Sequence, residues 1–537
     1  MADGSKRELR FERKMSDAEA LMWNVEKDPW MNPSGGVVTI LDRPLDVESF
    51  RARIRQSVAE IPRLRERVVS TTGRLANPTW TPDTEFDFDW HVRHLSLPTP
   101  GTERQLFDLT ALLLADPYDR TRPLWQFFVI DGLSEGRGAL FWRFHHSIMD
   151  GRAAIRLTES YMDLSRSVPL AEPVDIAALI AEVASHAAHH DAEGTTASVA
   201  GAAGQVVDAM RGPIALARRV ASEMLLMGAD PSRGPEAGVS VAHTVQAIRD
   251  QLGAPGSAGS TLWKNRSRRR HVEALSMPLA EAKAAAKTLG GSINDVFVAG
   301  AVAGAVAYHR AHGETLDYLN VSFVVSTRDD SAIGGNSFTP SVVKISTISS
   351  SAAEQVQALG ALMGERRADV GGGGGLLSNL ATIAKLLPTS VVTGFARQQA
   401  GAVDFATSNM RGAPFDVYIA GARLLRNVTL GPVAGTAFNM TCLSMGDHLD
   451  IGMHIDPVAV GDPAALRVCM ERAYAVLLDA GQTPSRVEKP GRKGATSALP
   501  KKRSAASAKK LMTKPATKPA TRPVKKIVKK IVKRSAA

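Results

Sequence analysis

Cysteine is nearly absent from the sequence, since the 537 residues contain only Cys442 and Cys469. Their separation has neither the spacing of a zinc site nor that of a redox pair. We therefore expect both to be small core residues in a protein of the reducing cytosol. With 44% hydrophobic residues, the chain is long enough to bury a sizeable core and to form roughly two to four domains.

Long apolar runs are also missing. The N-terminal segment, residues 6–14, is rich in charged side chains and offers no apolar stretch of signal-peptide length. The longest apolar run, Val296–Tyr308, is roughly half as long as a membrane-spanning helix requires. The sequence thus predicts neither a cleaved leader nor a spanning helix.

Acidic residues are scarce in the C-terminal tail. Residues 488–537 contain 17 Lys and Arg but one Glu, a net charge of +16, whereas residues 1–487 carry −5. The tail has no aromatic residue, and from Thr513 it repeats a tetrapeptide of the type Thr-Lys-Pro-Ala three times. Such a segment cannot bury a core, so we expect it to be disordered.

The end of the tail, residues 524–533, combines valine and isoleucine at helical spacing with lysines on the other face. A short basic amphipathic helix is expected there only on an anionic surface, because β-branched residues and few turns destabilise it in free solution. Residues 513–537 are therefore predicted to hold the protein at an anionic membrane or lipid-droplet surface. Non-specific DNA binding through the same charges is the alternative.

The most informative segment is the heptapeptide HHSIMDG, residues 145–151, which follows a strand-like run at residues 138–144. A neutral imidazole can accept a proton from an alcohol as the alcohol oxygen attacks an acyl carbonyl, which is the chemistry of acyl transfer. Asp150 could fix the tautomer of the ring or hold the loop by pairing with an arginine. Gly151 permits a backbone angle or a close approach that a Cβ would prevent.

Other interpretations of this segment remain open. Adjacent histidines occur by chance, and His189-His190 in the same chain fits a solvated helix face. Two histidines and an aspartate could ligate zinc, but neighbours on a strand point to opposite faces, so only one histidine easily faces a given site. The partner of Asp150 is open between Arg143 and Arg328.

HHSIMDG resembles the HHxxxDG motif of the CoA-dependent acyltransferase superfamily. An ordered set of further segments resembles the bacterial wax ester synthase/diacylglycerol acyltransferase family, over roughly residues 15–480. These segments are Met15–Glu19, Pro123-Leu124-Trp125, Gly291–Val296, Ser326-Thr327-Arg328 and Gly335-Asn336. Two departures from the family pattern, at residues 408–414 and 443–447, leave the histidine pair unchanged.

The resemblance implies an α/β fold of two chloramphenicol-acetyltransferase-like domains with the active site at their interface. We expect an N-terminal acyltransferase domain at residues 1–165 and a helical connector and link at 166–260. A C-terminal acyltransferase-like domain is expected at 261–487, followed by the disordered basic tail at 488–537. Periodicity alone indicates only a mixture of strands and helices, among them helices at 152–164, 279–289 and 295–308 and a strand at 318–326.

The reaction implied by the family is transfer of a long-chain acyl group from acyl-CoA to diacylglycerol or a long-chain alcohol. His146 would be the base, His145 would support the loop geometry, and Asp150 would hold the motif in shape. No metal or redox cofactor is expected. Further motif residues that the resemblance places near the site are Gly151, Pro123, Leu124, Trp125, Asn294, Asp295, Arg328 and Asn336.

Several of these residues also have a structural explanation. Trp125 fits a core position, and Ser292 with Asp295 fits a helix cap. Two rival functions stay open: a condensation-type acyltransferase that uses a carrier protein, and a non-catalytic lipid-body or nucleoid tether acting through the tail. The expected location is cytoplasmic, with peripheral attachment to a membrane or lipid droplet.

Overall fold

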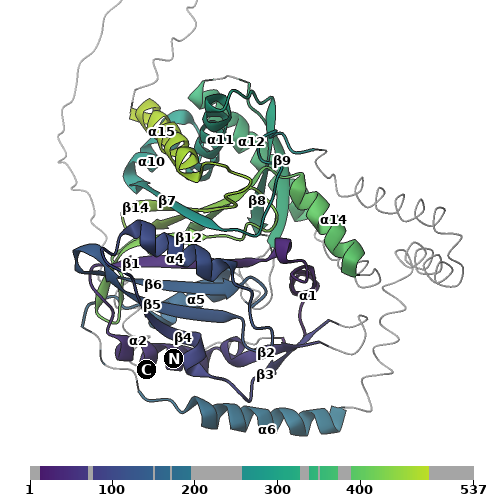
Figure 1. The fold of residues 1–537 in the computed structure, drawn as a ribbon, viewed down its shortest axis with the longest axis vertical. Coiled ribbons are helices and arrows are strands. Elements are labelled where there is room, and N and C mark those ends of the chain that lie inside the picture. Colours follow the sequence, from purple (N-terminus) through teal and green to yellow (C-terminus); the bar gives the residue numbers. More distant parts are fainter. Residues whose placement is uncertain are drawn as a thin grey trace, which may run out of the picture. The chain divides into compact units, whose positions relative to one another are not determined.

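Two six-stranded sheets form the framework of the protein (Figure 1). The computed structural model describes residues 12–70, 77–148, 151–167, 169, 172–194, 257–326, 338–348, 351–372 and 389–482. All of them fall within one compact unit, residues 1–485. The predicted basic tail, residues 488–537, lies outside the described residues, as does most of the predicted connector.

The first sheet has the order β11-β12-β1-β6-β5-β4. Its strands are β1 (Ser34–Leu41), β4 (Val92–Ser96), β5 (Trp125–Leu133), β6 (Arg137–His145), β11 (Tyr418–Ile419) and β12 (Ala422–Leu430). β6 lies at the centre of an antiparallel group and pairs with β1 on one side and β5 on the other. The apolar run that predicted a strand at residues 138–144 therefore forms a central strand, as expected of a segment buried on both faces.

Helices cover both faces of this sheet because its strands alternate apolar side chains between two cores. Val38 and Phe141 face α4, whereas Leu41 and Trp142 face α2 and α5. The helices of this half are α1 (Asp17–Val25), α2 (Val47–Glu60), α3 (Phe88–His91), α4 (Glu103–Ala115), α5 (Gly151–Tyr161) and α6 (Ile176–Gly194). A small hairpin, β2 (Glu66–Val69) and β3 (Thr79–Pro82), and the 3-10 turns η1 (Pro29–Met31), η2 (Pro62–Arg65) and η3 (Ser134–Gly136) complete it.

The second sheet has the order β7-β14-β13-β10-β8-β9. Its strands are β7 (His271–Pro278), β8 (Tyr318–Ser326), β9 (Phe338–Ser346), β10 (Phe405–Arg411), β13 (Phe438–Met445) and β14 (His448–Ile455). β8, β10 and β13 run parallel, and the outer strands pair antiparallel. β8 coincides with the predicted strand.

The described helices in the second half of the sequence are α10 (Leu279–Leu289), α11 (Ile293–Ala311), α12 (Ala352–Gly372), α14 (Thr389–Gly401) and α15 (Pro463–Gln482). α10 coincides with its prediction, and α11 contains the predicted buried helix, whose apolar residues are nearly all inaccessible. In the described part of the chain no single helix has the length and hydropathy of a membrane span; α10 and α11 pass only as a pair, bent by 91°. Cys442 is buried and Cys469 half-buried, and both are free thiols.

The first sheet contains two strands from the second half of the sequence, β11 and β12. β12 lies in the second half of the sequence, yet it pairs with β1 in the first sheet, with Val428 opposite Val38. The predicted domain boundaries stay a prediction, with the addition that residues 418–430 complete the sheet of the first segment.

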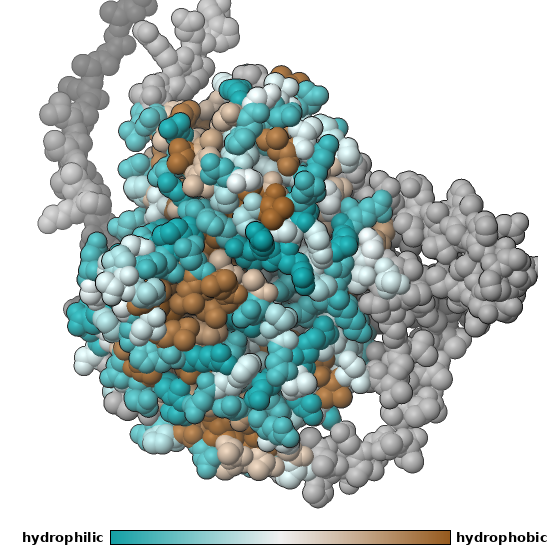
Figure 2. Space-filling view, viewed as in Figure 1, coloured by the Kyte–Doolittle hydropathy of each residue, from teal (hydrophilic) through white to brown (hydrophobic). Residues whose placement is uncertain are grey.

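Figure 2 shows that the viewed face of the molecule is mainly hydrophilic, with separate apolar patches.

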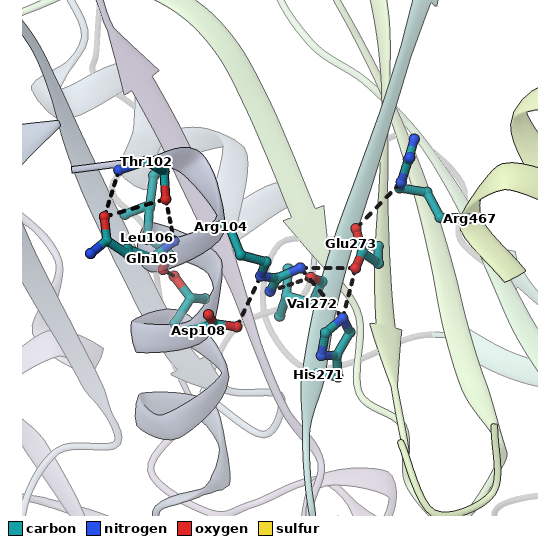
Figure 3. A network of polar contacts seen from close by, with 10 residues as sticks. Thr102, Arg104, Gln105, Leu106, Asp108, His271, Val272, Glu273 and Arg467 are labelled. Carbon is teal, nitrogen blue, oxygen red and sulfur yellow. Dashed lines mark hydrogen bonds and ion pairs between the residues drawn. The ribbon is translucent and has the colours of Figure 1, made fainter. Parts of the chain in front are cut away.

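A polar network also joins the two halves (Figure 3). Arg104 on α4 pairs with Glu273 on β7, at 2.8 Å between Nη1 and Oε1, and donates to the carbonyl oxygen of Val272. His271 and Arg467 contact the same Glu273 carboxylate, so one acidic side chain connects α4, β7 and α15. The halves are thus fixed to each other by a shared sheet and by ionic contacts.

Candidate active site

The histidine pair lies where β6 ends. The backbone N–H of His145 donates to the carbonyl oxygen of Leu124 at 3.0 Å, and that of His146 donates to the carbonyl oxygen of Pro33 at 3.3 Å. His145 thus lies beside the Pro123-Leu124-Trp125 segment, and Ser34 at the start of β1 faces it on the other side. Two neighbouring strands therefore position the turn that carries the predicted base.

His145 is completely buried, and its surroundings fix its tautomer. The backbone N–H of Ser147 donates to His145 Nδ1 at 3.1 Å, and Ser147 Oγ lies 2.6 Å from the same nitrogen. Because Nδ1 accepts a hydrogen bond, the ring proton sits on Nε2. Nε2 lies 3.2 Å from Glu26 Oε2, although the N–H does not point straight at that oxygen. His145 therefore holds the turn in shape and is enclosed by protein.

Glu26 is a functional candidate that the sequence did not reveal. Its carboxylate, 8% exposed, lies between His145 and Arg120, whose Nη1 is 3.1 Å away. Burial raises the pKa of Glu26, but the contact with His145 and the charge of Arg120 bring the net pKa below its usual value. The Arg120 guanidinium in turn lies 3.4 Å from the ring centre of Trp23 on α1. Only its position after an apolar helix distinguishes Glu26 in the sequence.

His146 has different surroundings from its neighbour. It is only half-buried, and its ring centre lies 6.2 Å from that of Phe144. His145 is thus enclosed whereas His146 is accessible, since neighbours at the end of a strand point to opposite sides. Of the two, His146 is the histidine that a substrate could reach.

The rest of the heptapeptide is only partly described. Asp150 lies outside the described residues, and Gly151 begins α5. Arg143, one candidate partner of Asp150, donates to the carbonyl oxygen of Leu113 near the end of α4, and its guanidinium lies 4.3 Å from the ring centre of Tyr118. The other candidate, Arg328, lies outside the described residues.

Trp125 is a core residue, as its structural interpretation expects. It is fully buried, its Nε1–H donates to the carbonyl oxygen of Leu64 at 2.8 Å, and its ring stacks on His91 with 4.4 Å between ring centres. Burial lowers the pKa of His91 to about 4. Pro123 and Leu124 are buried beside it. The segment contacts the end of β6 through the backbone hydrogen bond from His145 to Leu124.

The second half contributes a further group of motif residues. Ser292 Oγ accepts from the backbone N–H of Asp295 at 3.3 Å, and Asp295 Oδ2 accepts from that of Ser292 at 2.7 Å, so the expected helix cap is present. Asn294 Oδ1 accepts from Asn409 Nδ2 at 3.3 Å, and Asn294 also contacts Met363. The structure thus brings Asn294 next to the segment at residues 408–414, which departs from the family pattern.

These motif residues lie at the C-terminal ends of the parallel strands of the second sheet. The parallel strands β8 and β10 end there, at Ser326 and Arg411, and α11 begins there. Asn336, like Arg328, lies outside the described residues. Among the residues described, no three metal-ligating side chains come together.

Comparison with protein families identifies both halves of the chain. The wax ester synthase/diacylglycerol acyltransferase catalytic domain matches residues 15–297, which is more than half of the chain, and the corresponding C-terminal domain matches residues 334–477. A Mycobacterium tuberculosis protein that carries the name diacylglycerol O-acyltransferase is 27% identical over 474 residues, covering 87% of this chain and 92% of the relative. Another, tgs3, is 38% identical over 144 residues, covering 26% of this chain and 53% of the relative.

Solved structures show the same fold. The wax ester synthase/diacylglycerol acyltransferase from Marinobacter aquaeolei VT8 matches with a TM-score of 0.57 and 19% identity, covering 87% of this chain and all of that chain. The first condensation domain of the calcium-dependent antibiotic synthetase matches with a TM-score of 0.51 and 18% identity, covering 89% and 98%. These likenesses confirm the predicted α/β fold.

Proposed function

The chain belongs to the wax ester synthase/diacylglycerol acyltransferase family, and on that premise we propose how its residues carry out acyl transfer. As a member, it is an O-acyltransferase that forms triacylglycerol or wax ester. Acyl-CoA is the proposed donor, and diacylglycerol or a long-chain alcohol is the proposed acceptor. The observation that supports the assignment of roles is the contrast between an accessible His146 and an enclosed His145.

In the proposed reaction His146 acts as the general base. It takes the proton of the acceptor hydroxyl as that oxygen attacks the thioester carbonyl, and a new C–O bond forms. The C–S bond then breaks, and the CoA thiolate takes the proton back from the imidazolium, so atoms and charges balance. A well-placed base of this kind contributes roughly 10²–10⁴-fold to the rate.

Glu26, His145 and Ser147 are proposed to keep the base in place. Ser147 and Glu26 engage the two ring nitrogens of His145, which stops the turn after β6 from rotating. His146 follows directly, so its backbone is held in place by the contacts of His145. Asp150 stays proposed as a residue that holds the motif in shape.

The experiment is lipid analysis after incubation of the full chain with palmitoyl-CoA and either diacylglycerol or hexadecanol. We expect one ester formed for each CoA released, and a loss of roughly two orders of magnitude or more in the His146→Ala variant, with its melting temperature unchanged. Near-normal turnover in that variant would exclude His146 as the base.

The same assay separates the rival activity. The condensation domain that shares the fold motivates a carrier-dependent alternative. Ester formation from a palmitoylated carrier protein, with none from palmitoyl-CoA, would favour the carrier-dependent activity over the acyl-CoA-dependent one.

We also propose a peripheral location for the enzyme. The +16 charge of residues 488–537 and the apolar stripe at residues 524–533 suit an anionic membrane or lipid droplet, where a lipid acceptor resides. DNA binding by the same charges is the rival outcome.

A further inference from the structure

A groove of about 630 Å³ lies between α11, α12 and the edge strand β9. Its walls are mainly apolar, and its volume falls within the usual range of small-molecule sites. In Figure 2, apolar side chains form separate patches on the upper part of the viewed face, where Figure 1 draws these three elements. Residues that line the groove include Ala299, Ala303, Ala307, Ile345, Leu359 and Leu362.

The shape of the groove follows from the residues on α11. Ala299, Ala303 and Ala307 recur at every fourth position, so they lie on one face of the helix, and their short side chains leave the space beside α12 unfilled. From Ala299 to Arg310 the helix extends roughly 16 Å. The groove is therefore an elongated channel that suits an alkyl chain better than a compact ligand.

One end of the groove carries two positive charges. Arg310 lies near the end of α11, and Lys344 lies on β9 opposite Asn320, close to where β8 begins. Both side chains are exposed, and among the described residues neither forms an ion pair. Lys344 Nζ lies 3.8 Å from the ring centre of Tyr318.

The other end of the groove is apolar. Leu362 is half-buried there, and the neighbouring Met363 contacts Asn294 at the start of α11. Gln357 on α12 also reaches this end, where its Nε2 donates to the carbonyl oxygen of Leu289 at 3.1 Å. α12 therefore crosses α11 near the start of α11, and the channel leads from a cationic mouth toward apolar walls. None of the lining residues belongs to the first sheet or to the histidine cluster.

We propose that this groove binds one anionic single-chain lipid, a fatty acid, with its carboxylate between Arg310 and Lys344 and its alkyl chain along α11. Charge complementarity selects this occupant: a carboxylate pairs with both cations, whereas the chain's own basic tail is repelled by them. An uncharged diacylglycerol leaves both charges unused. The site is separate from the histidine pair, so it goes beyond the proposed acyl transfer and does not depend on it.

The proposal is tested by titrating the full-length protein with palmitate and measuring saturable binding by calorimetry. In the double variant Arg310→Gln and Lys344→Gln we expect roughly tenfold weaker binding of palmitate, with binding of uncharged hexadecanol unchanged. Ala303→Phe fills the channel and is expected to abolish this saturable site. From octanoate to dodecanoate, the affinity of the unaltered protein should rise roughly fourfold per methylene.

Matched controls lie on α10. Lys287→Gln removes an exposed positive charge there, and Ala284→Phe places a phenylalanine on its exposed face. Both should bind palmitate like the unaltered chain. Unchanged palmitate binding in Ala303→Phe would overturn the site. Loss of binding in Ala303→Phe without any effect of the charge variants would overturn the anionic ligand in favour of a neutral lipid. Ester formation is measured separately, so failure of the proposed function is distinguishable.

Discussion

His145 and Glu26 form a buried contact whose removal should affect both stability and catalysis. In Glu26→Gln the shape of the side chain is kept, but the charge that faces Arg120 is lost. Since Arg120 is partly exposed, we expect a loss of about 2 kcal/mol in unfolding free energy, less than the roughly 3–5 kcal/mol for breaking a fully buried pair. The rate should fall while KM changes little, because Glu26 acts on the base through His145.

The measurements are urea unfolding and steady-state kinetics over a range of pH. Glu60→Gln, at an exposed position at the end of α2, is the matched control and should leave both unchanged. A Glu26→Gln protein with normal kcat at every pH would show that the contact has no positioning role.

Two buried histidines should make the protein sensitive to acid. Burial lowers the pKa of His91 to about 4 and that of His454 to about 3, whereas the unfolded chain has pKa values near 6.5. The unfolded state thus binds protons first, so the stabilising effect is complete above about pH 6.5 and is lost as pH falls toward 4 and 3. We expect about 2 kcal/mol per histidine to be lost between pH 7 and pH 5.

Urea unfolding at several pH values measures this dependence. His91→Asn, which cannot take up the proton, should reduce the slope of stability against pH by about 1.2 kcal/mol per pH unit between pH 6 and 5. The variants are compared by this slope and not by the unfolding free energy at one pH, because the substitution also lowers stability at every pH. An unchanged slope would mean that His91 is protonated in the folded protein.

At the scale of elements, the packing of α11 against α15 depends on glycine. An added Cβ at Gly304 would lie 2.8 Å from the Cα of Met470, so the helices would have to move apart. Gly304→Ala should therefore cost about 2 kcal/mol of unfolding free energy. Gly364→Ala on α12 is the matched control, since nothing lies within 4 Å of its added Cβ.

The control should stabilise the protein by up to about 1 kcal/mol, because alanine favours a helix over glycine. Chemical denaturation of both variants provides the comparison. If Gly304→Ala were as stable as Gly364→Ala, the close approach of α11 and α15 would be incorrect.

Local sequence patterns predicted elements well where the pattern itself decides the structure. The apolar run before His145 predicted β6, and Ser292 with Asp295 predicted the cap of α11. Both predictions succeed because burial and capping depend on residues only a few positions apart. The pairing of β12 with β1 and the contact of Glu26 with His145 could not be predicted this way. Both join residues more than a hundred positions apart, and no local pattern specifies such partners.

The candidate site shows the same limit. The heptapeptide indicated a base by its residue types, and the family resemblance indicated which histidine it is. Whether His145 or His146 is enclosed depends on Glu26 and Ser147 packing around the end of β6, which only the structure shows. Asp150, Arg328 and Asn336 stay predictions.

At the scale of the whole molecule, the tail should decide where the enzyme resides. A chain that ends at Val487 should lose binding to anionic vesicles while keeping its activity on dispersed substrate. Changing Ile527, Val528, Ile531 and Val532 to Ser keeps every charge, so we expect weaker vesicle binding and unchanged binding to duplex DNA. Cosedimentation with vesicles and a DNA mobility assay at the same salt concentration measure both.

The Ser variant is decisive between the two uses of the tail. If it binds vesicles as well as the intact chain does, the apolar stripe has no role and the tail acts only through its charge. If the truncated chain still binds vesicles fully, the membrane contact lies elsewhere in the protein.

The pairing of β12 with β1 also has a consequence during synthesis. β1 ends at Leu41, and β12 begins at Ala422, so a ribosome that adds about 5–20 residues per second delivers the second strand roughly 20–80 s after the first. For that time the nascent first sheet has an open edge at β1, with the apolar side chains of Val38 and Ile40 and unpaired backbone groups. The growing chain therefore has a window in which a chaperone, or another nascent copy, could occupy the place reserved for β12.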